Sequence, residues 1–159
     1  HYDAGDFIVA WDMYRDEQKS QRGCDYYSES ENQGMLSLRK ADGTTAGWLA
    51  KGAGAGGYEG RNSAVNWQTV FGTDKYYYEI TFSSTGYTNI KVSAAMLFNY
   101  NAYSVQNVEY STDGENFVKV GQFTFEAAKT WYNSECALPE PACGQAIVYV
   151  HFILDYKSE

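Results

Sequence analysis

The sequence is poor in the residues on which several functional classes depend. Lys and Arg number only 12 against 20 Asp and Glu, so the formal net charge of the 159 residues is −8. This balance argues against a nucleic-acid partner, because neutralising phosphates requires clustered basic side chains. No apolar run approaches the roughly 20 residues of a membrane span, and no signal peptide is visible. We therefore expect neither nucleic-acid binding nor membrane insertion.

Cysteine and histidine are also scarce, with three and two residues respectively. There is no CxxC motif, and His1 and His151 lie near opposite ends of the chain, so a zinc site is not expected. Cys136 and Cys143 bracket the loop Ala-Leu-Pro-Glu-Pro-Ala, which a disulfide between them would close. Cys24 would then have no disulfide partner. Three free thiols are the alternative.

What the sequence does have is a strong period of two. Apolar and polar residues alternate across residues 76–83 and again across 90–99, which is the pattern of strands with one buried face. Ser84-Thr85-Gly86 supplies the turn between them. Within 108–120, Asp113-Gly114 predicts a hairpin, because both residues tolerate the positive φ that tight turns often need.

The rest of the chain continues this pattern without an internal repeat or a linker. We predict an all-β fold, a two-sheet antiparallel β-sandwich or jelly roll of about nine or ten strands. Residues 1–159 are expected to form a single domain. Further strands are expected at residues 6–13, 35–39, 46–50, 130–136 and 146–156.

The strand sequences resemble a known group of domains. The strings YYYEITFSSTGYTNIKVS (76–93) and VEYSTDGENFVKVGQF (108–123) are similar to galactose-binding-like jelly-roll domains of extracellular bacterial proteins. Residues 7–13 and 147–152 look like the first and last strands of that group, so the resemblance spans about residues 7 to 155. Many members of the group are non-catalytic carbohydrate-binding modules, and the resemblance implies this function without specifying the ligand.

Sugar recognition needs flat aromatic rings for the apolar face of a pyranose and planar polar side chains for its hydroxyls. Residues 47–68 offer both, and a second cluster of tyrosines and amides begins at residue 99, where strand alternation stops. The 15 tyrosines exceed what a core of this size requires. The residues predicted to bind the ligand are Trp48, Lys51, Tyr58, Arg61, Asn62, Trp67, Gln68, Asn99, Tyr100 and Tyr103.

A glycine-rich stretch within the first cluster matches GxGxxG at Gly52, Gly54 and Gly57. We reject a dinucleotide site, because a helix must follow such a loop and residues 61–68 show no helical periodicity. The glycines instead favour a mobile flap that carries Tyr58 beside the binding site and would select chain ends. A plain connection is the alternative.

Some aromatic residues are expected to serve the core instead. Trp11 and Trp131 each alternate within a predicted strand and are expected to be buried. Trp48 and Trp67 flank turn-rich segments, so core and binding roles stay open for both. Tyr100 and its neighbour Tyr103 are expected at the surface, with capping of a sheet end as the alternative.

Enzymatic functions have weaker support. Glycoside hydrolysis requires two carboxylates across the scissile bond, but Glu79 is alone on its strand and is expected to be a solvated residue. His151 is expected to be a satisfied, half-buried residue of the last strand. His1 invites comparison with the copper brace of lytic polysaccharide monooxygenases, in which His151 would be the second histidine. The sequence does not otherwise look like that family.

No cofactor is expected, although galactose-binding-like modules often hold a structural calcium ion near the sandwich edge. No EF-hand-like spacing fixes its ligands. The oxygen donors available for such an ion are Asp3, Asp6, Asp25, Glu29 and Asp155.

Together, the residues and the resemblance predict a secreted or cell-surface, non-catalytic carbohydrate-binding module within a larger multidomain bacterial surface protein. The expected partner is a neutral polysaccharide or oligosaccharide, starch or maltooligosaccharides ahead of β-glucan, because an acidic polysaccharide would require a basic site. A protein-interaction or adhesion domain is the main alternative. A copper-dependent polysaccharide oxidase that uses His1 is a remote one.

Overall fold

The computed structural model describes residues 7–11, 21–45, 50–51, 65–66, 76–97 and 105–155. Their regular structure consists of antiparallel strands and two short 3₁₀ turns, which confirms the predicted all-β class. The turns are η1 (Ser30–Asn32) and η4 (Glu140–Ala142). The strands are β1 (Val9–Ala10), β2 (Gln21–Gly23), β3 (Tyr26–Tyr27), β4 (Met35–Arg39), β5 (Ala50–Lys51), β6 (Val65–Asn66), β7 (Tyr77–Phe82), β8 (Lys91–Met96), β9 (Val105–Ser111), β10 (Val118–Thr124), β11 (Tyr132–Ala137) and β12 (Val148–Leu154).

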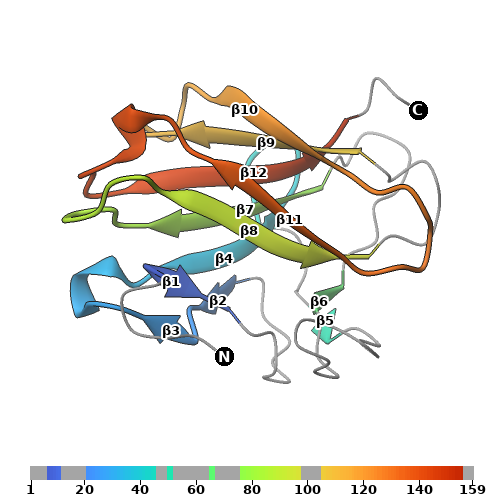
Figure 1. Cartoon of the computed structure of the whole chain (residues 1–159), viewed down its shortest axis with the longest axis horizontal. Helices are drawn as coiled ribbons and strands as arrows, with labels where there is room; N and C mark the ends of the chain where they lie inside the picture. The colour runs from blue at the N-terminus through green and yellow to red at the C-terminus, as the bar shows by residue number, and fades with distance from the viewer. Residues whose placement is uncertain are drawn as a thin grey trace.

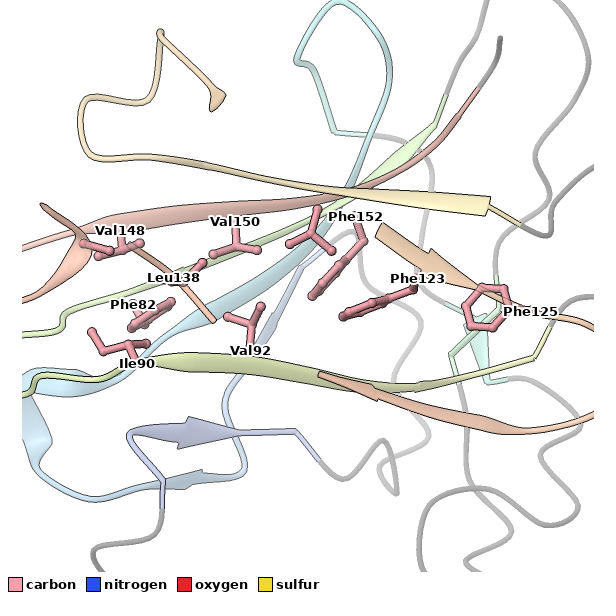
Figure 2. Packing of buried hydrophobic residues seen from close by; sticks show 11 residues of the cluster. Phe82, Ile90, Val92, Phe123, Phe125, Leu138, Val148, Val150 and Phe152 are labelled. Carbon is pink, nitrogen blue, oxygen red and sulfur yellow. The ribbon is translucent and has the colours of Figure 1, made fainter. Parts of the chain in front are cut away.

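The main layer of the sandwich is a six-stranded sheet (Figure 1). Its strand order is β10-β9-β12-β7-β4-β2, so strands that are neighbours in space are often distant in sequence. β8 and β11 pair with each other and lie across the core from this sheet (Figure 2). The two layers confirm the predicted antiparallel sandwich.

The core lies between these layers. In β12, every second side chain points toward it. Val148, Val150, Phe152 and Leu154 are buried on its inner face. Complete burial of a side chain of this type stabilises the fold by about 1.5–3 kcal/mol. Figure 2 shows Val148, Val150 and Phe152 facing residues of the opposite layer. The further buried members of this cluster are Phe82, Ile90, Val92, Val108, Phe123, Phe125, Leu138 and Ala142.

Trp11 packs against the small apolar cluster on β4, but it is half-buried and not fully buried as predicted. It follows β1, which pairs with β3, and lies against Leu36 and Leu38 on the inner face of β4. Its Nε1 donates a hydrogen bond of 3.1 Å to the carbonyl oxygen of Arg22, so the indole is satisfied without solvent.

The core-facing position that was predicted for Trp131 is occupied by Tyr132, the first residue of β11. Tyr132 packs against the main core, and its ring centroid is 5.6 Å from that of Phe125. Trp131 lies just before β11 and is half-buried. The prediction that Trp131 occupies the core was wrong by one residue, because a Trp-Tyr pair fits the alternation in either register.

One end of the sandwich is formed by the start of β7 and the ends of β4 and β12, where Tyr77 is in register with Arg39 and Ile153. The start of β9 and the end of β10 pair at the same end. Tyr132 at the start of β11 is in register with Met96 at the end of β8. We call this the Tyr77 end, and the opposite one the Ser84 end.

The Ser84 end is fixed by buried hydrogen bonds between side chains and backbone. Ser84 Oγ donates to the carbonyl oxygen of Ala142 at 2.5 Å and accepts from the backbone N–H of Gln145 at 2.9 Å. Asn32 Nδ2 donates to the carbonyl oxygen of Ser83 at 2.8 Å. These bonds tie the turn after β7 to both η1 and η4.

The hairpin between β9 and β10 folds over the outer face of the six-stranded sheet. Gly114 has a φ of 78°, and a Cβ at this position would lie 2.9 Å from Cζ of Tyr149 on β12. Asp113 does not adopt the positive φ expected of it. Its carboxylate instead accepts hydrogen bonds from the backbone N–H groups of Glu115 and Asn116, both at 2.8 Å. The hairpin was therefore predicted correctly, but its connection is longer than a two-residue turn.

Candidate functional site

The side chains predicted to bind sugar lie outside the described residues. Lys51 is placed only through its backbone, which pairs with Val65 between β5 and β6. The prediction for these side chains therefore stays a prediction. The others are Trp48, Tyr58, Arg61, Asn62, Trp67, Gln68, Asn99, Tyr100 and Tyr103.

The described strands do show where the two predicted clusters join the sandwich. The first cluster lies in the connection from β4 to β7, which begins beside Arg39, where an isolated bridge pairs this residue with Thr45. The second lies in the connection from the end of β8 to the start of β9. All of these strand termini belong to the Tyr77 end, so two segments distant in sequence are attached to the same end of the fold.

The outer face of the six-stranded sheet carries a buried polar network near this end. Glu79 on β7 and His151 on β12 are in register, and Glu79 Oε2 lies 2.7 Å from His151 Nε2. The other carboxylate oxygen, Oε1, accepts a hydrogen bond of 2.9 Å from Arg39 Nε on β4. Arg39 Nη1 also donates to the carbonyl oxygen of Gly43 at 2.8 Å. The network therefore ties three adjacent strands together through side chains.

Aromatic rings enclose the imidazole of His151. The Phe117 ring, from the β9–β10 hairpin, stacks on it with centroids 3.9 Å apart and an interplanar angle of 18°. Tyr77 lies on another side with centroids 4.4 Å apart. Only 9% of Glu79 and 8% of His151 is exposed. The prediction that His151 is satisfied is confirmed, although its burial is greater than expected, and the prediction that Glu79 is solvated was wrong.

The charges in this network stabilise one another. Burial by itself would raise the pKa of Glu79, but the hydrogen bond from His151 and the positive charge of Arg39 outweigh it, and the pKa is lowered. Burial raises the pKa of Tyr77, and the nearby Glu79 carboxylate raises it further. Glu79 therefore stays ionised at neutral pH opposite the guanidinium group.

This arrangement resembles half of a catalytic triad, but the described residues place no nucleophile beside it. Within the part of the chain that the structure describes, no hydroxyl or thiol group hydrogen-bonds to His151. The hydroxyl-bearing residue Ser37 on β4 is in register with Glu79, but its Oγ accepts a hydrogen bond from Gln21. We interpret the network as a structural element of the outer face.

Sequence reasoning missed this network because its members are far apart in the chain. Glu79 and His151 both occupy outward positions of alternating strands, and this was the only available signal. Their contact depends on β7 pairing with β12, and the pairing of distant strands is not visible in the alternation itself.

The structure describes only some of the residues that were considered as metal ligands. Across residues 7–11, 21–45, 76–97 and 105–155, no group of three or more His, Cys, Asp or Glu side chains is arranged to hold a metal ion. Of the proposed calcium donors, Asp3 and Asp6 lie outside the described residues, whereas Asp155 accepts a hydrogen bond of 3.3 Å from Gln122. For copper, His1 is likewise outside, and Nε2 of His151 is already bonded to Glu79.

The structure shows all three thiols unbonded. Cys24, Cys136 and Cys143 are each half-buried and free. Cys136 Sγ lies 3.6 Å from the carbonyl oxygen of Val120 on β10, and burial raises its pKa. This favours the second of the two alternatives for the cysteines, three free thiols.

No family model matches the chain, and no curated protein or solved structure shows significant similarity to it. No helix long and apolar enough to cross a membrane occurs in the described ranges. The resemblance to galactose-binding-like domains thus remains a prediction from the sequence, alongside the sandwich fold that the structure shows.

Proposed function

We propose that this chain is a non-catalytic carbohydrate-binding domain that recognises a neutral glucan at the Tyr77 end of the sandwich. The observation that carries the proposal is the attachment of both predicted clusters to that end, through the termini of β4, β7, β8 and β9. A single ligand could then meet the tryptophans of one segment and the tyrosines and amides of the other.

The chemistry of these segments suits a neutral sugar chain. Aromatic rings stack on the apolar face of a pyranose, and amide or guanidinium groups bond to its hydroxyls. Individual contacts of this kind contribute on the order of 1 kcal/mol, so dissociation constants between about 1 μM and 1 mM are expected. The net charge of −8 disfavours an acidic polysaccharide. We propose starch or maltooligosaccharides first and β-glucan second.

The proposal also concerns the location of the protein and the domains that accompany this one. A non-catalytic domain of this type acts by holding a larger protein on its polysaccharide. We therefore propose a secreted or cell-surface bacterial protein with further domains, as the resemblance implies.

A second candidate function is docking to a protein partner at the opposite end of the sandwich. All of the large apolar side chains that are exposed among the described residues lie toward the Ser84 end or on β3 beside it. Exposed apolar side chains at one end of a domain suit a protein interface better than a sugar site. These side chains are Tyr27, Met35, Val118 and Ile147.

A glycan array followed by affinity electrophoresis in soluble starch and β-glucan tests both candidates. Trp48→Ala and Trp67→Ala should abolish retardation while the variants remain folded, and Tyr27→Ala, at the opposite end, should leave it unchanged. Unaltered migration of the wild type in every polysaccharide would contradict the sugar proposal and favour the protein partner.

If both tryptophan variants still bind, the site shifts to the second cluster. Tyr100→Ala and Tyr103→Ala should then reduce retardation. Binding that survives all four substitutions would contradict a site at the Tyr77 end.

A further inference from the structure

Apolar side chains lie next to one another on the outer face of the main sheet, beside the β9–β10 hairpin. Met35 on β4 is in register with Thr81 on β7, which is in register with Tyr149 on β12. Neighbouring strands are about 4.8 Å apart, so Met35 and Tyr149 lie about 10 Å apart on either side of Thr81. Ile147 directly precedes β12, and the alternation that points Val148 inward places Ile147 on the same face as Tyr149. We call Met35, Thr81, Ile147 and Tyr149 the Met35 patch.

The Met35 patch is accessible in the folded chain. Met35 is 37% exposed and Ile147 is 41% exposed, while Thr81 and Tyr149 are half-buried. Covering apolar surface of this kind is favourable, because it removes that surface from water. The patch therefore offers a partner protein a gain in free energy on contact.

The β9–β10 hairpin bounds the patch on one side. Gly114 lies over the ring of Tyr149, and the Phe117 ring meets the same tyrosine edge-on with centroids 6.4 Å apart. The open part of the patch extends from Tyr149 across Thr81 to Met35. A partner is thus expected to meet it as a single segment that runs beside the hairpin.

Exposed carboxylates flank the patch on two sides. Asp113 and Glu115 lie on the hairpin and are exposed. Glu29 is exposed just before η1, which the hydrogen bond from Asn32 Nδ2 to the carbonyl oxygen of Ser83 holds against the end of β7. The surroundings of the patch are therefore acidic.

The basic side chains that the structure describes lie away from the patch. Arg22 is buried on the inner face of β2. The others belong to the Tyr77 end, to β8 in the opposite layer, or to the edge strand β10, which β9 separates from β12. They are, in that order, Arg39, Lys40 and Lys129, then Lys91, and then Lys119. A partner that carries positive charge is favoured by this distribution.

We propose that the Met35 patch is a docking site for a basic segment of a partner protein, in which apolar side chains alternate with Lys or Arg. The apolar side chains cover Met35 and Ile147, and the basic ones reach the carboxylates of Glu29 and Glu115. The inference rests on the second candidate function and deepens it, since it names the surface and the chemistry of the partner. It is independent of sugar binding at the Tyr77 end.

A random peptide library displayed on phage and selected on the wild-type domain supplies the probe. The enriched peptides should combine Lys or Arg with apolar residues. The best of them, made synthetically, should bind the double variant Met35→Ser, Ile147→Ser about tenfold more weakly, measured by fluorescence anisotropy. The melting temperature of this variant should change little, because both side chains are exposed.

Val118→Ser is the matched apolar control. Val118 is 58% exposed, but its partner in register, Tyr110, packs against the core, so Val118 belongs to the other face of the sheet. This variant should keep the peptide affinity of the wild type.

The charge of the partner is tested separately. Glu29→Gln and Glu115→Gln should each weaken binding of the basic peptide about two- to fivefold, and added salt should reduce this difference. Glu126→Gln, at the Tyr77 end, should leave the affinity unchanged.

The outcomes distinguish this inference from the functions proposed above. Equal affinity for wild type and the double variant overturns the Met35 patch, while protein docking on another surface stands. Enriched peptides without Lys or Arg overturn the basic partner. If no peptide is enriched, both the inference and the second candidate function fail, and retardation in starch or β-glucan still decides the sugar proposal.

Discussion

Glu79 and His151 are separated by 72 residues in sequence, yet their side chains meet at 2.7 Å across two neighbouring strands. Arg39 completes the network from a third strand. A buried charge that is satisfied on both sides contributes little when intact, but loss of one partner is costly because the others stay buried. The network therefore makes the stability of the sheet sensitive to pH.

Replacing Glu79 with Gln should lower the free energy of unfolding at pH 7 by about 1–3 kcal/mol, because Arg39 and His151 lose the charge that they face. The pKa of Glu79 in the folded chain is below its ordinary value of 4.5. Its contribution is therefore complete above the unfolded-state pKa and is lost as the pH falls through the folded-state pKa. Urea unfolding of both proteins from neutral to acidic pH measures the difference.

The exposed Glu126 supplies the control for this experiment. Glu126→Gln should change the free energy of unfolding little at any pH. A difference between wild type and Glu79→Gln that stays constant down to about pH 3 would contradict a depressed pKa.

Gly114→Ala should destabilise the domain by more than the cost of its backbone conformation alone. The positive φ of 78° costs about 1 kcal/mol for alanine, and the new Cβ would also press on the ring of Tyr149. Gly43→Ala is matched, since its φ is 84° but nothing lies within 4 Å of a Cβ there. Equal losses in the free energy of unfolding for the two variants would show that the hairpin does not contact Tyr149.

Ser84→Ala should destabilise the Ser84 end by about 1–3 kcal/mol, because the carbonyl oxygen of Ala142 and the N–H of Gln145 would lose a buried partner. The exposed neighbour Thr85 gives the comparison. Thr85→Ala should cost less than half as much in chemical denaturation. If the two substitutions proved equivalent, the buried bonds of Ser84 would not be what fixes this end.

Titration of the denatured, unreduced protein with a thiol reagent should detect three thiols per chain, since Cys24, Cys136 and Cys143 are unbonded. In the native protein Cys136 should react slowly, because burial raises its pKa and reduces the thiolate fraction. Detection of a single thiol would show instead that two of the three cysteines form a disulfide, and peptide mapping would show whether they are Cys136 and Cys143.

The alternation of residues predicted much of the fold. β7, β8, β9 and β12 lie where period two placed them, because each has one face on a continuous core. The pairing of β12 between β7 and β9 depends on packing among distant segments, and no local pattern specifies it. The shift from Trp131 to Tyr132 has the same origin, since a pair of aromatic residues satisfies either register.

The candidate sites were predictable to different degrees. Aromatic and amide clusters can be read directly from composition, which is why Trp48 and Tyr100 were found as ligand candidates. Gln106 follows Tyr103 by three residues, but its enclosure between Phe123 and Leu154 becomes visible only when β9 is paired on both sides. A buried amide and an exposed one have identical sequence signatures.

The hairpin that lies over β12 also bears on self-association. Two bare sheets stack at a spacing of about 10 Å, and assemblies of cross-β type depend on that close approach. Phe117 and Gly114 occupy this space above His151 and Tyr149. A flat sheet from a neighbouring molecule is thus kept from docking on this part of the surface, and shortening the hairpin should make the protein prone to aggregate.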